Sequence, residues 1–143
     1  MINVTKGWPN SHGSEDSYPV LVGQDIVEGD FVLLVDDGAG NPVYRLLLST
    51  DIDAGIVDSM AGQALDTNTS FGYDVRYTGM LPVVKNNYTA QTDRYGAGTY
   101  APGTKLMIDV ARPGTVIPWV SGPVIGVVIS IDTESGVLKL TRR

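Results

Sequence analysis

The residue types that carry most enzyme chemistry are sparse in this chain of 143 residues. It has no cysteine and one histidine, His12, which lies in a polar stretch near the start. The absence of cysteine excludes a disulfide scaffold, a thiolate metal site and a cysteine nucleophile. A Ser-His-Asp triad would have to use His12, and a lone histidine in a polar segment is far more often a surface residue than a catalyst.

Two groups of acidic residues have a spacing that could bind a cation. Asp51, Asp53 and Asp58 resemble part of a calcium loop, which needs oxygen ligands at positions 1, 3 and 5 and glycine at position 6. Here Gly55 holds position 5 and an isoleucine holds position 6. Residues 36–38 (DDG) have the composition of a turn. We interpret both groups as turns, find no glycine-rich phosphate loop, and predict no catalytic residue, no metal site and no cofactor.

The chain carries a net charge of −6, from 10 basic and 16 acidic residues. Basic residues are needed to neutralise phosphates, so this balance argues against a nucleic-acid partner. Residues 1–74 hold 12 acidic and two basic residues, whereas residues 75–143 hold four acidic and eight basic ones. We expect strands of both halves to mix in one fold and neutralise each other. The alternative is complementary charge across a contact between subunits.

Composition predicts an all-β fold. Hydrophobic residues make up 43% of the chain and charged residues 18%, with 17 glycines, and long helix-forming charged side chains are scarce. The longest aliphatic run, residues 124–131, is far shorter than the roughly 20 residues that span a bilayer. The start of the chain lacks the apolar run of a signal peptide. We therefore expect a soluble protein, made in a cytoplasm, with no membrane partner.

The elements that would position a site are short strands separated by glycine- and aspartate-rich turns. We predict a compact antiparallel β-barrel or sandwich of about nine strands over residues 18–143, preceded by a flexible N-terminal arm, residues 1–17. Apolar or alternating runs predict strands at residues 18–22, 31–35, 43–48, 54–58, 70–78, 80–84, 104–109, 116–120, 124–131 and 137–141.

Single residues add local predictions. Residues 59–65 fit one helical turn. Pro82 lacks a backbone donor, which predicts an edge position for its strand. Gly29 is expected to make a turn, with Asp30 binding backbone amides. Gly136 ends a five-residue loop, so we expect it to have a positive φ and to close a hairpin.

Aromatic residues in polar surroundings predict contacts with a partner. Residues 86–103 have no apolar period and are predicted as a long loop, whose tyrosines stand among small polar residues, as in interaction surfaces. Tyrosines that only cover the end of the barrel would give the same pattern. The arm either frays or orders on a partner, and the tryptophan after Pro118 is either a contact or an ordinary core or edge residue. The predicted contact residues are Trp8, Tyr18, Tyr88, Tyr95, Tyr100 and Trp119.

Four segments resemble one protein family. Residues 98–108 (GTYAPGTKLMI), 124–128 (VIGVV) and 136–140 (GVLKL) resemble the last strands of tailed-phage capsid decoration proteins, also called cement or head-stabilising proteins. Residues 26–32 (IVEGDFV) resemble the start of a strand in the same proteins. The tyrosine-rich stretch and the polar arm depart from the family's pattern.

The resemblance implies a structural virion protein that is not an enzyme. Such proteins commonly sit as trimers on the outside of an icosahedral shell and bridge neighbouring major capsid subunits. The implied partners are the major capsid protein and other copies of this chain, and the implied location is the capsid exterior, after synthesis in a bacterial cytoplasm. A rigid β-body that spans subunits adds buried area at weak contacts, and closed symmetry multiplies each contact.

The resemblance also suggests roles for the contact residues. Trp8 and Tyr18 would anchor the arm to the shell, so deleting residues 1–17 would abolish shell binding without unfolding the domain. The three tyrosines of residues 86–103 would form the trimer seam or the shell contact. Trp119 would pack at the trimer axis.

Two other classes of protein stay open. A glycan- or receptor-binding β module of a phage tail or fibre would also be rich in strands and aromatic residues. Residues 54–58 (AGIVD) and 71–75 (FGYDV) resemble short motifs of trimeric dUTP pyrophosphatases, but in reversed order and without that family's phosphate motifs. A trimeric β-fold nucleotide hydrolase is therefore the weaker alternative. In an enzyme, alanine at Asp51, Asp53 or Asp58 would abolish activity without loss of stability.

Overall fold

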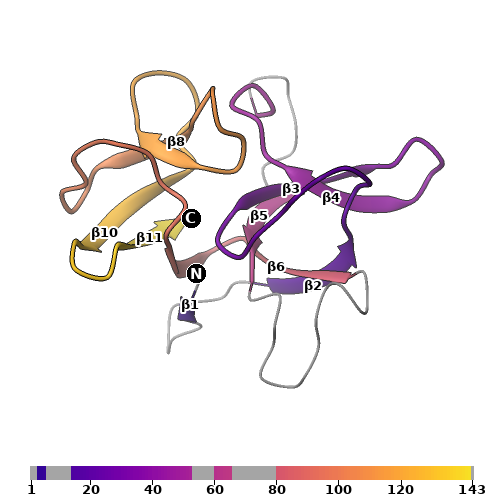
Figure 1. The fold of residues 1–143 in the computed structure, drawn as a ribbon, viewed down its shortest axis with the longest axis horizontal. Coiled ribbons are helices and arrows are strands. Elements are labelled where there is room, and N and C mark those ends of the chain that lie inside the picture. The colour runs from indigo at the N-terminus through magenta and orange to yellow at the C-terminus, as the bar shows by residue number, and fades with distance from the viewer. Residues whose placement is uncertain (1–2, 6–13, 53–59, 66–79, 143) are drawn as a thin grey trace.

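The described residues form eleven strands in two antiparallel sheets (Figure 1). No α-helix is present among them. The all-β prediction is confirmed, as a sandwich-like fold of two sheets. The computed structural model describes residues 3–5, 14–52, 60–65 and 80–142. The strands predicted at residues 54–58 and 70–78 lie outside this part of the chain.

Each sheet is built almost entirely from one half of the sequence. The six-stranded sheet has the order β1 (Asn3–Thr5), β7 (Tyr88–Thr92), β11 (Val137–Arg142), β10 (Gly126–Asp132), β8 (Lys105–Ile108), β9 (Val116–Pro118). The five-stranded sheet has the order β2 (Ser14–Pro19), β6 (Met80–Lys85), β5 (Ala61–Ala64), β3 (Phe31–Asp36), β4 (Pro42–Leu46). In Figure 1 the two sheets stand side by side, with β8, β10 and β11 of the first in orange to yellow and β2, β3 and β4 of the second in indigo to purple.

The five-stranded sheet curls until its two edges meet. Immediately after β2, Val20 forms a bridge with Tyr44 of β4, and Leu21 donates its N–H to the Tyr44 carbonyl at 2.9 Å. This closure removes exposed strand edges, which would otherwise pair with other chains. The interior of the resulting small barrel is filled by Val32, Tyr44, Ala64, Leu81 and Val83.

A second and larger core lies between the two sheets. Strand β3 serves both cores, because Phe31 and Leu33 point into the larger one whereas Val32 points into the barrel. Burial on both faces explains why β3 reads as a continuous apolar run rather than an alternating one. From the six-stranded sheet the larger core takes Tyr88, Ala90, Leu106, Ile108, Val116, Val128, Leu138 and Leu140.

Buried polar contacts also join the sheets. Arg142, at the end of β11, donates to the carbonyl of Ala61 in β5 at 2.9 Å. Asp30, just before β3, accepts a hydrogen bond from Arg94, just after β7, also at 2.9 Å. Burial raises the pKa of Asp30, although the N–H of Val27 and the Arg94 guanidinium act in the opposite direction. These links make the two sheets one body.

The sheet extends into the predicted arm. Strand β2 begins at Ser14, so residues 14–17 belong to the five-stranded sheet, and β1 pairs with β7. The polar residues of β2 form a strand because Asp16 finds two buried partners. Lys85 Nζ lies 2.7 Å from its carboxylate, and the Tyr44 hydroxyl donates to the same group. Burial, with this carboxylate, raises the pKa of Tyr44.

Strand β7 lies inside the stretch predicted as a loop, residues 86–103. Its residues alternate, with Tyr88, Ala90 and Thr92 buried and the intervening residues half-buried. Because these residues are small or polar, the alternation carries little hydrophobic signal. The remainder, from Asp93 on, is irregular apart from a bridge between Tyr95 and β9.

The helical turn predicted at residues 59–65 is wrong, because β5 occupies Ala61–Ala64. A Cβ on Gly62 would lie 2.2 Å from the carbonyl oxygen of Val84. Gly62 therefore allows β5 and β6 to approach closely. It is not a weak point in a helix.

The edge position predicted from Pro82 is also wrong, because β6 lies between β2 and β5. Leu65 donates its N–H to the Pro82 carbonyl at 2.9 Å. The reciprocal bond would run from the backbone nitrogen of residue 82 to the carbonyl of Leu65, and proline cannot make it. Its position lies just past Ala64, where β5 ends. The missing donor is tolerated because it faces the end of the neighbouring strand.

The glycine predictions are confirmed. Gly136 has a φ of 69° and closes the hairpin between β10 and β11. Gly29 has a φ of 91°, and Asp30 accepts the N–H of Val27 at 3.0 Å.

Candidate interaction surface

The predicted contact residues fall into different environments. Trp8 lies outside the described residues. Tyr18 is half-buried in β2 and packs against Tyr44, with ring centroids 6.0 Å apart. Tyr88 is 1% exposed and belongs to the core between the sheets. A contact of Tyr88 with a partner stays a prediction, and the side chain has little accessible surface with which to make it.

Tyr95 and Tyr100 pack against each other. Their ring centroids are 5.2 Å apart in an edge-to-face arrangement, and the Tyr100 hydroxyl donates to the Gly96 carbonyl at 2.5 Å. Burial raises the pKa of Tyr100 to about 12. Tyr100 thus holds its own loop, which fits the interpretation that tyrosines cover the end of the sheet. A contact of either tyrosine with a partner stays a prediction.

Trp119 is the predicted contact residue with the largest recorded exposure. It follows β9, and 40% of it is exposed. Its indole Nε1 donates to the Gly122 carbonyl at 2.8 Å, and Lys105 Nζ lies 5.3 Å from the ring centroid. The indole is therefore held in one orientation while its surface remains accessible, as in residues that dominate binding interfaces.

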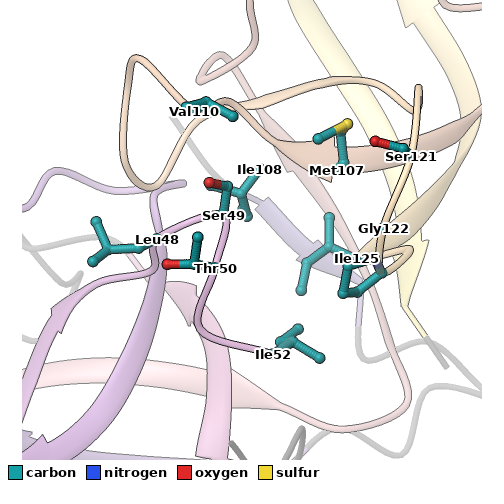
Figure 2. A pocket seen from close by; sticks show the side chains of 11 residues that line it. Leu48, Ser49, Thr50, Ile52, Met107, Ile108, Val110, Ser121, Gly122 and Ile125 are labelled. Carbon is teal, nitrogen blue, oxygen red and sulfur yellow. The ribbon is translucent and has the colours of Figure 1, made fainter. Parts of the chain in front are cut away.

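An apolar groove lies near Trp119 (Figure 2). The turn after β4 forms one wall, and β8 with the loop after β9 forms the other. The groove encloses about 220 Å³. No charged side chain lines it; the lining residues are Leu48, Ser49, Thr50, Ile52, Met107, Ile108, Val110, Ser121, Gly122, Pro123 and Ile125.

A buried ion pair fixes the first wall of the groove. The two guanidinium nitrogens of Arg45 each lie 2.8 Å from an oxygen of Asp51, and the N–H of Leu48 donates to the same carboxylate at 2.7 Å. Burial acts to raise the pKa of Asp51, but the bonds from Arg45 and Leu48 outweigh it and lower that pKa. The prediction that Asp51 belongs to a turn fits this geometry, whereas Asp53 and Asp58 lie outside the described residues.

Five exposed apolar side chains line the groove or belong to the loop after β9 that forms one of its walls, and we call them the apolar rim. Val110 and Val120 are each 76% exposed, and 40–44% of each of the other three is exposed. The basic residues Lys105 and Arg112 stand beside the rim, and Arg112 pairs with Asp109 at 3.2 Å. The rim consists of Leu48, Val110, Trp119, Val120 and Val124.

Sequence reasoning found Trp119 but missed the rest of the rim. Val110 and Val120 each follow a strand and stand among turn residues, where an aliphatic side chain has no core position to fill. The sequence could therefore have predicted that Val110 and Val120 are exposed. Leu48 could not be assigned to the rim from the sequence, because its place beside Val110 depends on how the two sheets pack.

The two aspartates of the β3–β4 turn serve local structure. In the β3–β4 turn, Asp36 Oδ1 accepts the N–H of Gly38 at 2.7 Å, and Asp37 Oδ1 accepts that of Ala39 at 2.7 Å. Within the described ranges, no group of three or more His, Cys, Asp or Glu is arranged to hold a metal ion, and no helix has the length and apolarity to cross a membrane.

The chain has no significant match among protein-family models, curated proteins or solved structures.

Proposed function

We propose that this chain is a structural virion protein that decorates the outside of a phage capsid, binds major capsid subunits, and acts as a homotrimer without enzymatic activity. The observation that carries the proposal is the apolar rim. Five apolar side chains stand exposed around a groove on a two-core β-body. Exposed apolar area of this kind marks a contact with another protein.

The rigidity of the body supports an adhesive role. A cement protein must transmit load between shell subunits, which requires that its contact residues keep their places. Here Trp119 is held by a hydrogen bond, and the Leu48 wall by the Arg45–Asp51 pair. Preorganised side chains lose little conformational entropy on binding.

The experiment is co-sedimentation of the purified chain with shells assembled from the major capsid protein of the same genome. We expect saturable binding to the outer surface and a higher temperature of shell disassembly. Trp119→Ala should weaken binding by about 2 kcal/mol, or roughly thirtyfold. Ala39→Ser, in the exposed β3–β4 turn, is the matched control and should bind normally.

Failure of the wild-type chain to sediment with shells would refute the decoration role. Binding of the isolated chain to glycans on an array, without shell binding, would instead favour the tail or fibre receptor module.

A further inference from the structure

We propose that copies of this chain associate head to tail, with an exposed turn of one copy inserted into the apolar groove of the next. The inserting segment, which we call the Val22 turn, is residues 21–25. The proposal deepens the self-association part of the proposed function and rests on it. It assigns that contact to two different surfaces of the same chain.

The groove suits side chains of a protein partner better than a small molecule. Its volume of about 220 Å³ lies below the roughly 300–1,000 Å³ typical of small-molecule sites. Its lining offers no charge and few polar groups to orient a ligand. A groove of this size and character can accept an aliphatic side chain, with surrounding contacts made by Leu48 and Val110, the two rim residues that line it.

The Val22 turn presents such a side chain. Val22 is 96% exposed, and Gly23 beside it has a φ of 88°, which shapes the turn. Gln24 donates its N–H to Leu21 O at 3.1 Å, and its side-chain Oε1 accepts the N–H of Leu46 in β4 at 3.0 Å. The turn is therefore tied to the barrel and presents the valine at its tip.

Charge favours this turn as the occupant. The described part of the barrel half, residues 14–85, carries eight acidic and two basic residues, and the last residue of the turn, Asp25, is exposed. Residues 86–142 carry four acidic and five basic residues. Exposed Lys105 stands beside Trp119 of the rim, whereas exposed Arg112 is paired with Asp109. An apolar tip with an acidic side chain beside it thus faces an apolar groove with Lys105 beside it, which is complementary in both respects.

The two surfaces differ, so the contact is heterologous. A heterologous contact leaves each copy with one free turn and one free groove until the series closes as a ring. Closure of three copies would give the trimer of the proposed function.

The test is the oligomeric state of the full chain in the absence of shells, measured by size-exclusion chromatography with light scattering. We expect a trimer for the wild type. Val22→Asp and Val110→Asp should each be monomeric, because each places a charge in the apolar contact. Both side chains are exposed, so each monomer should still unfold in one cooperative transition, at a temperature lowered only by the lost association, and Ala39→Asp controls for the added charge.

Mixing the two monomeric variants provides the decisive result. The intact turn of Val110→Asp can enter the intact groove of Val22→Asp, so the mixture should form a dimer with one working contact. In a separate experiment, the variant Asp25→Lys should weaken trimer formation roughly tenfold.

A monomeric or twofold dimeric wild type, trimers in either variant, or a mixture that shows no association even at concentrations far above those at which the wild type trimerises would overturn the proposal, because a single contact lacks the gain of ring closure. Sedimentation with shells reports separately on the decoration role. A monomer that still binds shells would refute only the head-to-tail contact.

Discussion

Asp51 shows how one side chain shapes the candidate interaction surface. Its carboxylate accepts two bonds from Arg45 and one from the backbone of Leu48. In Asp51→Asn the guanidinium loses its charged partner and the turn loses an acceptor. We expect a loss of about 1–3 kcal/mol in the free energy of unfolding at neutral pH, measured by urea denaturation. The exposed Glu134→Gln serves as control and should change it by less than about 0.5 kcal/mol.

The same residue predicts a pH dependence. Because the folded-state pKa of Asp51 is lowered, its contribution is fully present above the unfolded-state value of about 3.9 and is lost as the pH falls through the folded-state pKa. The stability difference between wild type and Asp51→Asn should therefore shrink below about pH 4. A difference that stayed constant between pH 7 and pH 2.5 would contradict the lowered pKa.

Among the elements, β5 depends most directly on one residue. Gly62→Ala would place a Cβ 2.2 Å from the backbone oxygen of Val84 and 2.7 Å from Val83 Cγ1. Backbone cannot move aside as a flexible side chain can, so we expect a loss of about 3 kcal/mol or more. Gly38→Ala is the control. It has a positive φ of 95° but nothing within 4 Å, so it should cost about 1–2 kcal/mol. Thermal denaturation of both variants checks that Gly62→Ala loses more stability than Gly38→Ala.

The elements that could be predicted from sequence are those with a strong apolar signal. Strands β3 and β11 follow from β-branched and leucine-rich runs, and the β10–β11 hairpin follows from Gly136. Strand β7 was missed because small and polar residues such as Ala90 and Thr92 fill a crowded core position without raising hydropathy. Strand β5 was misread because Gly62 breaks a helix and permits close strand packing equally well, and only the neighbouring strand decides between them.

The candidate surface was predicted only where one residue carried the signal. Trp119 was noted because a tryptophan that follows a proline in a short predicted strand is either a contact or an ordinary core or edge residue. The groove joins Leu48 to Val110, two positions brought together by the packing of separate sheets, which local patterns do not encode. The tyrosines were recognised as unusual, but sequence alone did not separate Tyr100, which holds its loop, from an exposed contact residue.

At the scale of the whole molecule, the acidic and basic halves stay apart. We expected strands of the two halves to mix, but the five-stranded sheet takes only β6 from the second half and the six-stranded sheet takes only β1 from the first. The halves still neutralise each other in part, because Lys85 pairs with Asp16 and Arg94 pairs with Asp30. Complementary charge across a contact between subunits stays a prediction.

Strand β3 makes the whole molecule one cooperative unit, because its two faces belong to the two cores. Leu33→Ala, in the core between the sheets, should cost about 2–5 kcal/mol, and Val32→Ala, inside the barrel, about 1–3 kcal/mol. Each variant should shift a single calorimetric transition whose van't Hoff and calorimetric enthalpies agree. Two separate transitions would show that the barrel unfolds independently of the six-stranded sheet.

The position of β1 has one further consequence. Thr5 and Thr141 both align with Thr89, on opposite sides of β7. The first and last strands, β1 and β11, therefore run about 10 Å apart at this level. A circular permutant with a short glycine-serine bridge from Arg142 to Asn3 and new ends opened in the exposed Asp36–Asn41 turn would therefore retain every strand pairing of both sheets. Cargo fused at those new ends would project from the barrel, away from the sheet that holds β1 and β11.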